Sequence, residues 1–515
     1  MKIEINTQFE KALAAMDAGR NIFITGKAGT GKSTLLEYFR NKTEKNIVVL
    51  APTGVAAVNV RGQTIHSFFR FRPDITLEKV KQKYRKIQNS QIYKKIDALV
   101  IDEISMVRAD LLDCVDAFLR LHGKKKNYPF GGIQIIFIGD LYQLPPVVVG
   151  QERKIFSTLY KSPYFFDSQA FPDIDIEIIE LDKIYRQKDE VFIRILNAVR
   201  NRSIDMDLLE ILNRRVNHDF EPDSKDFFIH LVTTNNKAFE INMIRLGKLP
   251  KKAHSYHGEV SGEFDEKSLP APLDLTVKVG AQIMLTNNDR EGRWVNGTVG
   301  LIIDIKKEDE IDAILVKLET GETVDVFPYR WETFKFSYND SSRKIESATV
   351  GFFTQYPLIL AWAITIHKSQ GKTFQKAVVD LGQGTFAHGQ AYVALSRCVS
   401  LEGLVLKNSL EKKHVLLDWR IVKFLTQFHY KKSEEEMPLE EKTSIIQKAI
   451  KDKTPLEILY LKSSDEKSRR VVKPYVIGEM NYQGRQFLGF SGFDELRGQD
   501  RVFRVDRILE IKTKI

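Results

Sequence analysis

A glycine-rich segment near the N-terminus constrains this chain more than any other feature. Residues 26–33 read Gly26-Lys27-Ala28-Gly29-Thr30-Gly31-Lys32-Ser33 and match the pattern G-x-x-x-x-G-K-[ST]. An apolar, β-rich run at 21–25 precedes the segment and a helical pattern at 34–40 follows it, as a phosphate-binding loop requires. Because the N–H groups of such a loop and the following helix N-terminus converge on phosphate oxygens, the sequence predicts a nucleoside triphosphate site.

One such site is expected in the chain. The second candidate, Gly371-Lys372-Thr373, has Ile366 where the pattern requires its first glycine. In the matching loop, Lys32 is placed to reach the β- and γ-phosphates, and the Ser33 hydroxyl is placed to bind Mg²⁺. ATP and Mg²⁺ are therefore the expected cofactors.

Two adjacent carboxylates end a second apolar run. Residues 98–101 are followed by Asp102 and Glu103. An apolar run that ends in Asp-Glu is a weak signal alone, but it becomes strong beside a phosphate-binding loop upstream on the same sheet. Asp102 is expected to hold Mg²⁺ through water, and Glu103 to act as general base toward the attacking water.

The spacing of apolar runs predicts an α/β fold with two parallel-sheet lobes. Strand-like runs at 21–25, 47–50, 98–101 and 133–138 alternate with helical patterns, which is typical of a parallel sheet covered on both faces. We expect one lobe at 1–175 and a second, split lobe at 176–286 plus 351–425.

Three segments depart from this alternation. Residues 62–95 are basic and aromatic and are expected to be an insertion, although a charge run is also compatible with a solvated surface. Residues 287–350 contain short strands and turns, which predict a small antiparallel barrel or sheet. Residues 426–454 are expected to be a linker, with a charged, helical pattern at 431–458, and residues 455–515 are expected to form a separate β-rich module.

The charge and residue composition of the chain restrict its possible binding partners and cellular compartment only in part. The 515 residues have a formal net charge of +10, which favours a polyanion such as nucleic acid but fits a basic protein without such a partner equally well. Cys114 and Cys398 cannot form a zinc site by themselves and suggest a reducing compartment. With no signal-like N-terminus and no long apolar run, we expect a cytoplasmic, nucleoid-associated bacterial protein without membrane contact.

Several segments in a fixed order resemble the motifs of the Pif-one family of superfamily-one helicases, close to its RecD-like branch. The resemblance covers roughly residues 5–420 and rests on Gln8 and on residues 51–57, 62–69, 102–107, 137–146, 181–187, 363–371 and 392–397. It implies two RecA-like lobes with one ATP between them. The insertion at 62–95 resembles the family's wedge (domain 1B), and residues 287–350 resemble its SH3-like domain (2B).

The resemblance assigns roles to individual residues. Gln8 resembles the family's adenine-reading glutamine, Gln143 would sense the γ-phosphate or orient water, and Arg186 and Arg397 would stabilise transition-state charge. Surface salt bridges for the arginines and a loop amide for Gln143 are the alternatives. The expected catalytic residues are Lys32, Asp102, Glu103, Gln143, Arg186 and Arg397. The expected ATP-binding residues are Gln8, Gly26, Ala28, Gly29, Thr30, Gly31, Lys32, Ser33 and Thr34.

Hydroxyl, amide and cationic side chains in the same motifs suit contacts to a sugar-phosphate backbone, and aromatic rings suit stacking on bases. The expected DNA-binding residues are Pro52, Thr53, Thr64, His66, Phe68, Thr365, His367, Lys368 and Ser369. Phe69 and Phe71 are further stacking candidates. The alternative for Phe68, Phe69 and the two histidines is a place in the hydrophobic core.

The C-terminal module resembles a WYL domain. The resemblance rests on residues 469–475, 486–490 and 503–508, but the eponymous Trp-Tyr-Leu stands here as Gln486-Phe487-Leu488. Tyr475, Arg497, Arg504 and Arg507 could form a basic, partly aromatic face for single-stranded nucleic acid or a nucleotide-like ligand. A purely structural module is the alternative.

Together these patterns predict an ATP-dependent DNA helicase that moves 5′ to 3′ on single-stranded DNA in repair, recombination or replication. The polarity comes from the resemblance alone. The expected partners of this monomer are single-stranded DNA and forked or tailed duplexes, with G-quadruplexes and R-loops as further candidates. A regulatory ATPase that binds nucleic acid and switches a complex without unwinding is the alternative.

Overall fold

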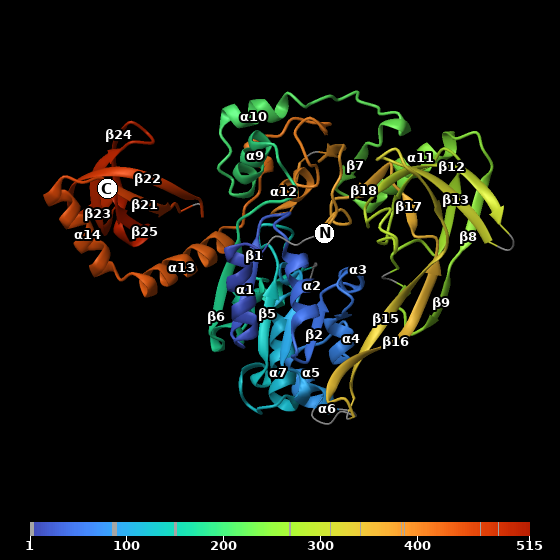
Figure 1. The fold of residues 1–515 in the computed structure, drawn as a ribbon, viewed down its shortest axis with the longest axis horizontal. Helices are drawn as coiled ribbons and strands as arrows, with labels where there is room; N and C mark the ends of the chain where they lie inside the picture. The colour runs from blue at the N-terminus through green and yellow to red at the C-terminus, as the bar shows by residue number, and fades with distance from the viewer. Residues whose placement is uncertain are drawn as a thin grey trace. The chain divides into compact units, whose positions relative to one another are not determined.

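The computed structural model describes residues 5–84, 90–148, 152–266, 269–308, 311–339, 341–382, 384–385, 387–463, 465–482 and 484–514 (Figure 1). The chain divides into two compact units. The first comprises residues 1–200 and 204–416, and the second comprises residues 201–203 and 417–515.

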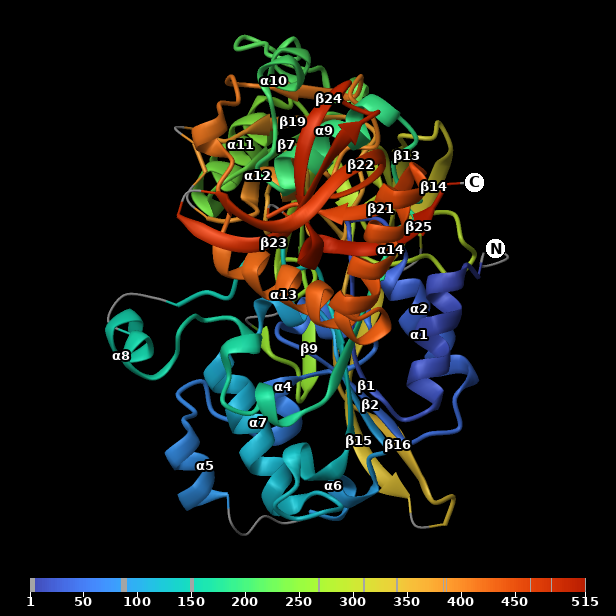
Figure 2. The same cartoon turned by 90° about the vertical axis from the view of Figure 1, so that its left-hand side faces the viewer.

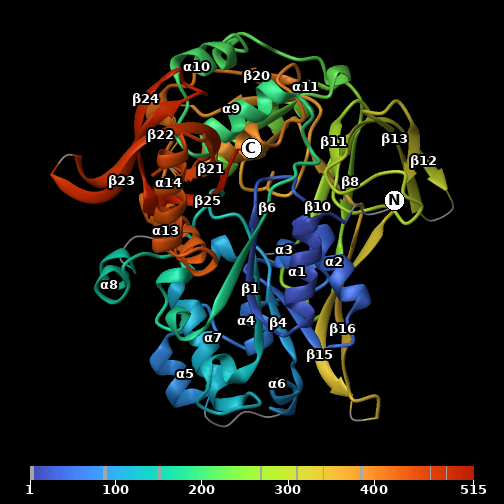
Figure 3. The same cartoon turned by 60° about the vertical axis from the view of Figure 1, so that its left-hand side comes forward.

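The first lobe is built on a six-stranded parallel sheet of order β3-β2-β4-β5-β1-β6. Its strands are β1 (Asn21–Gly26), β2 (Ile47–Ala51), β3 (Gln63–Thr64), β4 (Ala98–Ile101), β5 (Gln134–Ile138) and β6 (Ile176–Leu181). Helices α1 (Thr7–Asp17) and α2 (Lys32–Lys42) share one apolar core with the sheet, and α7 (Ala109–His122) is a further helix of this lobe (Figure 3). The parallel sheet predicted from the apolar runs is confirmed.

The boundary between the lobes differs from the expected one. Strand β6, which the sequence placed at the start of the second lobe, pairs along its whole length with β1, from Asn21–Ile176 to Gly26–Leu181. A strand's apolar pattern predicts that it is buried but not which neighbour it pairs with. Residues 176–181 therefore belong to the first lobe.

The second lobe contains a four-stranded parallel sheet of order β18-β7-β19-β20. Its strands are β7 (Ile229–Val232), β18 (Ala363–Thr365), β19 (Ala377–Asp380) and β20 (Leu404–Leu406). Its helices include α9 (Glu190–Arg200), α10 (Met206–Asn213), α11 (Asn235–Lys248) and α12 (Gln390–Leu395). The strands of this sheet come from both sides of residues 287–350.

The β-rich insertion is larger than the expected 287–350, a range in which residues 309, 310 and 340 lie outside the described residues. Its strands are β8 (Ala253–His257), β9 (Glu259–Gly262), β10 (Asp274–Lys278), β11 (Gln282–Leu285), β12 (Val299–Glu308), β13 (Ile311–Leu318), β14 (Thr323–Val326), β15 (Tyr329–Asn339), β16 (Lys344–Gln355) and β17 (Leu358–Leu360). They form sheets of order β14-β13-β12-β11-β17, β15-β16-β9 and β10-β8. Val277 and Ile283 share one core with Ile302 and Val316, so the early strands belong to the insertion.

The wedge insertion (residues 62–95) contains α4 (Ile65–Phe69), α5 (Leu77–Lys83) and α6 (Gln91–Lys95), while residues 85–89 lie outside the described residues (Figure 2). The hairpin β15–β16 runs along this part of the first lobe (Figure 1), where the Phe336 N–H donates to Gln63 Oε1 at 3.3 Å. Phe68, Phe69 and Phe71 are 6%, 0% and 6% exposed. These rings are core residues here, and their predicted stacking on bases is not supported by their exposure.

The second unit is an antiparallel sheet of order β24-β23-β22-β21-β25 with two helices. The elements are α13 (Trp419–Glu436), α14 (Leu439–Asp452), β21 (Leu456–Leu461), β22 (Lys467–Tyr482), β23 (Arg485–Asp494), β24 (Gln499–Arg504) and β25 (Ile508–Thr513). The segment expected to be a linker, 426–454, lies in α13 and α14, in agreement with its helical pattern. Ile446 and Ala449 of α14 lie in one core with Leu456 and Val472, because apolar residues at helical spacing are interleaved with the charges.

Among the described residues, no helix combines the length and the apolar character that crossing a membrane would require.

A half-buried glutamate in the insertion gives a stability prediction. Burial raises the pKa of Glu319 to about 7, although Lys376 opposes the shift. The pKa of Glu319 in the folded protein thus lies above the ordinary glutamate value of 4.5. Ionisation of Glu319 therefore destabilises the folded state; the destabilisation is fully present above pH 7 and disappears as the pH falls toward 4.5. Glu319→Gln is therefore expected to slow amide hydrogen exchange in β12 and β13 at pH 8 and to change it little at pH 5. The exposed Glu322→Gln should show no such dependence, and a Glu319→Gln effect of equal size at both pH values would contradict the prediction.

Candidate active site

The phosphate-binding loop joins β1 to α2, as the sequence predicts. Gly29 and Gly31 have φ of 79° and 87°, a region that favours glycine, and a Cβ on Gly29 would lie 2.5 Å from Arg186 Cβ. Lys32 Nζ donates to the carbonyl oxygens of Gly26 at 2.7 Å and Lys27 at 3.0 Å. Burial lowers the pKa of Lys32, while Asp140 and Glu103 oppose the shift. The loop therefore presents a desolvated cation between carboxylates.

The two predicted carboxylates follow β4 directly. Asp102 is 8% exposed. Burial raises the pKa of Asp102, and the neighbouring Glu103 charge raises it further. Burial likewise raises the pKa of Glu103, while Lys32 and Arg397 lower it. Glu103 also has φ 49° and ψ 42°, a left-handed conformation that costs energy outside glycine and occurs preferentially at functional sites.

Gln143 links the two lobes. It follows β5, is 6% exposed, and its Nε2 donates to Asp140 Oδ2 at 3.3 Å. Gln370 Nε2, which follows β18 of the second lobe, approaches Gln143 Oε1 at 3.5 Å. Gln143 is thus a buried residue that contacts both its own loop and the second lobe.

Arg186 and Arg397 converge on the same region. Arg186 Nη1 donates to the Ser396 carbonyl oxygen at 3.2 Å, and the adjacent Tyr185 N–H donates to the Gly29 carbonyl oxygen at 2.9 Å. Arg397 is 1% exposed, and its Nε donates to the Val393 carbonyl oxygen at 2.9 Å. Burial, with repulsion from Arg186, lowers the pKa of Arg397 to about 9. The alternative of a surface salt bridge is therefore wrong for Arg397.

Neither guanidinium forms an ion pair within the described part of the chain. The further acceptors of Arg397 are the Ser396 hydroxyl and the carbonyl oxygens of Ser369 and Lys372. Arg186 lies beside Gly29 of the glycine-rich loop, and Arg397 acts electrostatically on Arg186 and Glu103. Two positive charges whose hydrogen-bond acceptors are neutral are electrostatically suited to bind an anion.

The remaining predicted nucleotide residues lie around this loop. Gln8, in α1, donates from Nε2 to Asp182 Oδ2 at 3.4 Å. Thr30 Oγ1 donates to the Lys27 carbonyl oxygen at 2.9 Å, and the exposed Ser33 and Thr34 lie in the first turn of α2. The sequence thus located the loop and its immediate neighbours.

The predicted DNA-binding residues fall into two groups. Thr53 and Lys368 are exposed, and Pro52, Thr64, His66 and His367 are half-buried. By contrast, Thr365 and Ser369 are 4% and 0% exposed; Ser369 Oγ donates to the Ile366 carbonyl oxygen at 2.7 Å, and Thr365 Oγ1 accepts from the Lys368 N–H at 3.3 Å. The hydroxyls of Thr365 and Ser369 form hydrogen bonds within the loop that follows β18. Because both side chains are buried there, the structure does not support direct contact of either hydroxyl with DNA.

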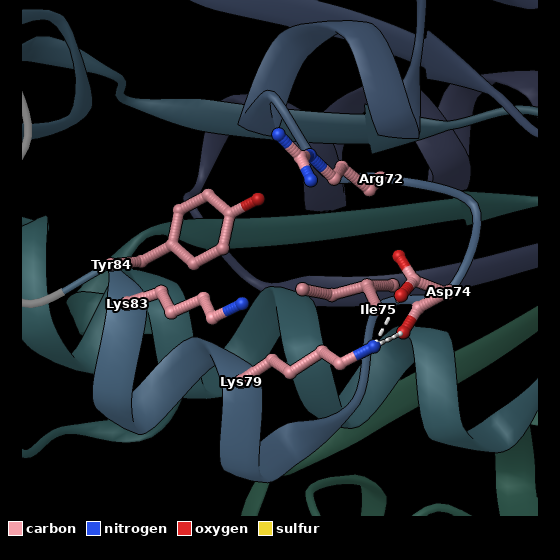
Figure 4. Close-up of a pocket in the computed structure, with 6 residues that line it drawn as sticks. All are labelled: Arg72, Asp74, Ile75, Lys79, Lys83 and Tyr84. Carbon is pink, nitrogen blue, oxygen red and sulfur yellow. Dashed lines mark hydrogen bonds and ion pairs between the residues drawn. The ribbon is translucent and has the colours of Figure 1, made fainter.

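A basic pocket lies in the wedge insertion (Figure 4). It is lined by Arg72, Asp74, Ile75, Lys79, Lys83 and Tyr84. Lys79 forms an ion pair with Asp74, and the Tyr84 hydroxyl donates to the Arg70 carbonyl oxygen at 2.8 Å. Cations outnumber carboxylates in this pocket, so the wedge presents positive charge to solvent.

Sequence reasoning missed two residues beside the nucleotide loop. Arg200 is 5% exposed, lies 3.4 Å from Asp140, and stacks on the Tyr142 ring at 3.9 Å from its centroid. The sequence did contain a pattern that could have indicated the burial of Arg200. This arginine stands on the apolar face of α9, four residues after Leu196 and one after Val199. Tyr392, 4% exposed, accepts a hydrogen bond at 3.0 Å from the Ala28 N–H; only the tertiary structure shows this contact.

Comparisons with known proteins agree with this geometry. The family model described as PIF1-like helicase matches residues 4–207, and the WYL domain model matches residues 441–513. The crystal structure of Pif1 from Bacteroides sp in complex with ADP-AlF4 superposes with a TM-score of 0.76 at 35% identity, over 84% of this chain and 98% of that one.

Two curated relatives show the same relationship. The ATP-dependent DNA helicase Pif1 of Bdellovibrio bacteriovorus is 32% identical over 438 residues, which cover 83% of this chain and 93% of the relative. The human ATP-dependent DNA helicase PIF1 is 34% identical over 411 residues, which cover 78% of this chain but only 60% of the human protein. The chain therefore belongs to the PIF1-like helicase family and ends in a WYL domain.

Proposed function

We propose that the protein is an ATP-dependent DNA helicase. The observation that best supports this function is the pair of guanidinium groups of Arg186 and Arg397, which have only neutral hydrogen-bond acceptors. Arg186 lies beside Gly29 of the phosphate-binding loop, and the charge of Arg397 acts on Glu103. Each relative is named for the same activity. A γ-phosphate between the loop and these arginines would supply the missing negative charge and draw the two lobes together.

Ser33 and Asp102 are the residues proposed to hold Mg²⁺. A hydroxyl and a carboxylate, completed by phosphate oxygens and water, are the oxygen ligands that Mg²⁺ prefers. Asp102 fits this role because it is buried and because burial and the Glu103 charge raise its pKa, so a cation would favour its ionised form. Magnesium would neutralise phosphate charge, while Lys32 binds the phosphates and Glu103 accepts the proton of the attacking water.

Loss of the γ-phosphate would then weaken the contacts that hold Arg186 and Arg397 at the loop. Because these residues and Gln370 connect the second lobe to the first, hydrolysis would let the lobes separate and reclose. We propose that this cycle moves the chain 5′ to 3′ along single-stranded DNA. Pro52, Thr53, Thr64, His66, His367 and Lys368 would track the sugar-phosphate backbone.

The proposal includes DNA forks and tailed duplexes as substrates, with the wedge at the strand-separation point. The same proposal includes G-quadruplexes and R-loops as further substrates. It also includes action as a monomer, a role in repair, recombination or replication, and association with a bacterial nucleoid.

In the WYL domain, Tyr475 is 53% exposed and Arg504 lies over the Phe487 ring at 5.1 Å. With Arg497 and Arg507, these side chains would form a face for single-stranded nucleic acid.

Strand displacement from tailed duplexes tests the activity. With ATP and Mg²⁺, the full-length protein is expected to release the strand from a duplex with a 5′ tail and not from one with a 3′ tail. ATP hydrolysis stimulated by DNA without displacement from either tail would instead support the regulatory ATPase. Displacement from the 3′ tail alone would reverse the proposed polarity.

A further inference from the structure

Tyr392 connects the second lobe directly to the phosphate-binding loop. It lies in α12, is 4% exposed, and its hydroxyl oxygen accepts a hydrogen bond at 3.0 Å from the Ala28 N–H. The N–H groups of such a loop are the groups that face nucleotide phosphates. The phenol oxygen of Tyr392 therefore lies at the phosphate-binding side of the loop.

The Tyr392 hydroxyl retains a proton to donate. A phenol has one O–H donor in addition to its acceptor capacity, and within the described residues no hydrogen bond has this hydroxyl as donor. Burial raises the pKa of Tyr392 to about 12, so the group keeps its proton at neutral pH. Arg186, which contacts the same loop, and Arg397 bring positive charge to the same region.

The loop before α12 is held tightly against the Asp140–Gln143 segment. His388 Nε2 lies 3.1 Å from the Leu141 carbonyl oxygen, and a Cβ on Gly389 would lie 2.4 Å from the carbonyl oxygens of both Tyr142 and Gln143. Arg200 stacks on Tyr142 and pairs with Asp140 from the other side. Because backbone and side chains fix this junction, Tyr392 has little freedom to leave the loop.

We propose that Tyr392 is a further ATP-binding residue, whose hydroxyl accepts from Ala28 and donates to an oxygen of the terminal phosphate. This inference rests on the proposed ATPase function and deepens it. An accepted hydrogen bond from a neutral amide polarises the phenol and strengthens its donation to an anion. The contact would distinguish ATP from ADP and connect the γ-phosphate to α12, the helix that Arg397 follows.

Nucleotide affinity of the Tyr392→Phe variant tests this assignment. The substitution removes the donor and keeps the ring, so the affinity of the full-length protein for the non-hydrolysable analogue AMP-PNP with Mg²⁺ is expected to fall about tenfold to a hundredfold. The affinity for ADP should stay within about twofold because ADP lacks the terminal phosphate, and this retained binding also verifies that the variant is folded.

Tyr356→Phe is the matched control. Tyr356 is also 4% exposed, and its hydroxyl donates to the Asp312 carbonyl oxygen at 2.6 Å in the β-rich insertion; its loss should change neither affinity. Equal weakening of ADP and AMP-PNP by Tyr392→Phe would show a structural role only, and no change in either would remove Tyr392 from the site; both results overturn the proposal. Failure of the unmodified protein to bind AMP-PNP would instead refute the ATPase function itself.

Discussion

Replacement of Arg397 by alanine is expected to lower kcat for DNA-stimulated ATP hydrolysis by about a thousandfold or more. The Arg397 guanidinium is buried, has only neutral hydrogen-bond acceptors, and carries a pKa that burial lowers to about 9. A developing negative charge on the transferred phosphoryl group would be its missing partner, and this interaction is strongest in the transition state. Steady-state ATPase rates at saturating single-stranded DNA measure the effect.

The affinities for ADP and for single-stranded DNA should remain close to those of the unmodified protein. Arg215→Ala is a suitable control, because Arg215 lies in the same lobe and also donates to backbone carbonyls, those of Glu402 and Leu404. Its loss is expected to affect stability rather than kcat. An Arg397→Ala protein that binds ADP normally and keeps more than a tenth of the ATPase rate would argue against a role in the transition state.

Glu103→Gln is expected to lower kcat by about a hundredfold to ten-thousandfold, the usual contribution of a general base. Glutamine keeps the size of the side chain but cannot accept the proton of the attacking water. Removal of one negative charge near Lys32 should leave ATP binding intact, so the variant is expected to accumulate in the ATP-bound state. Single-turnover hydrolysis together with AMP-PNP binding measures both quantities.

Asp102→Asn separates this role from that of the proposed metal ligand. The asparagine variant should need a higher Mg²⁺ concentration for half-maximal ATPase activity, whereas Glu103→Gln should leave the Mg²⁺ requirement unchanged. If Glu103→Gln shifted the Mg²⁺ requirement and Asp102→Asn did not, the two carboxylates would have exchanged roles.

Local patterns were sufficient for much of the fold. The strands at 21–25, 47–50 and 98–101 appear as expected, because each is a short apolar run buried on both faces of a parallel sheet. The helical pattern of α14 was expected, but its charges suggested a solvated linker, and the packing of its apolar residues against the C-terminal sheet was not predicted. The assignment of β6 failed for another reason: pairing with β1 is a long-range choice that a strand's own residues do not encode.

The same division holds at the active site. The sequence by itself determined the phosphate-binding loop and the carboxylates after β4, because their chemistry depends on residue types at short, fixed spacing along one strand–loop–helix unit. Only the tertiary structure decided that Ser369 and Thr365 are buried and that Arg200 and Tyr392 reach the site. These contacts join residues from two lobes, and burial and hydrogen bonding between distant segments arise only when both lobes are folded and packed. The glycine-rich loop therefore located the proposed ATP site, while the packing of the second lobe determined which side chains surround it.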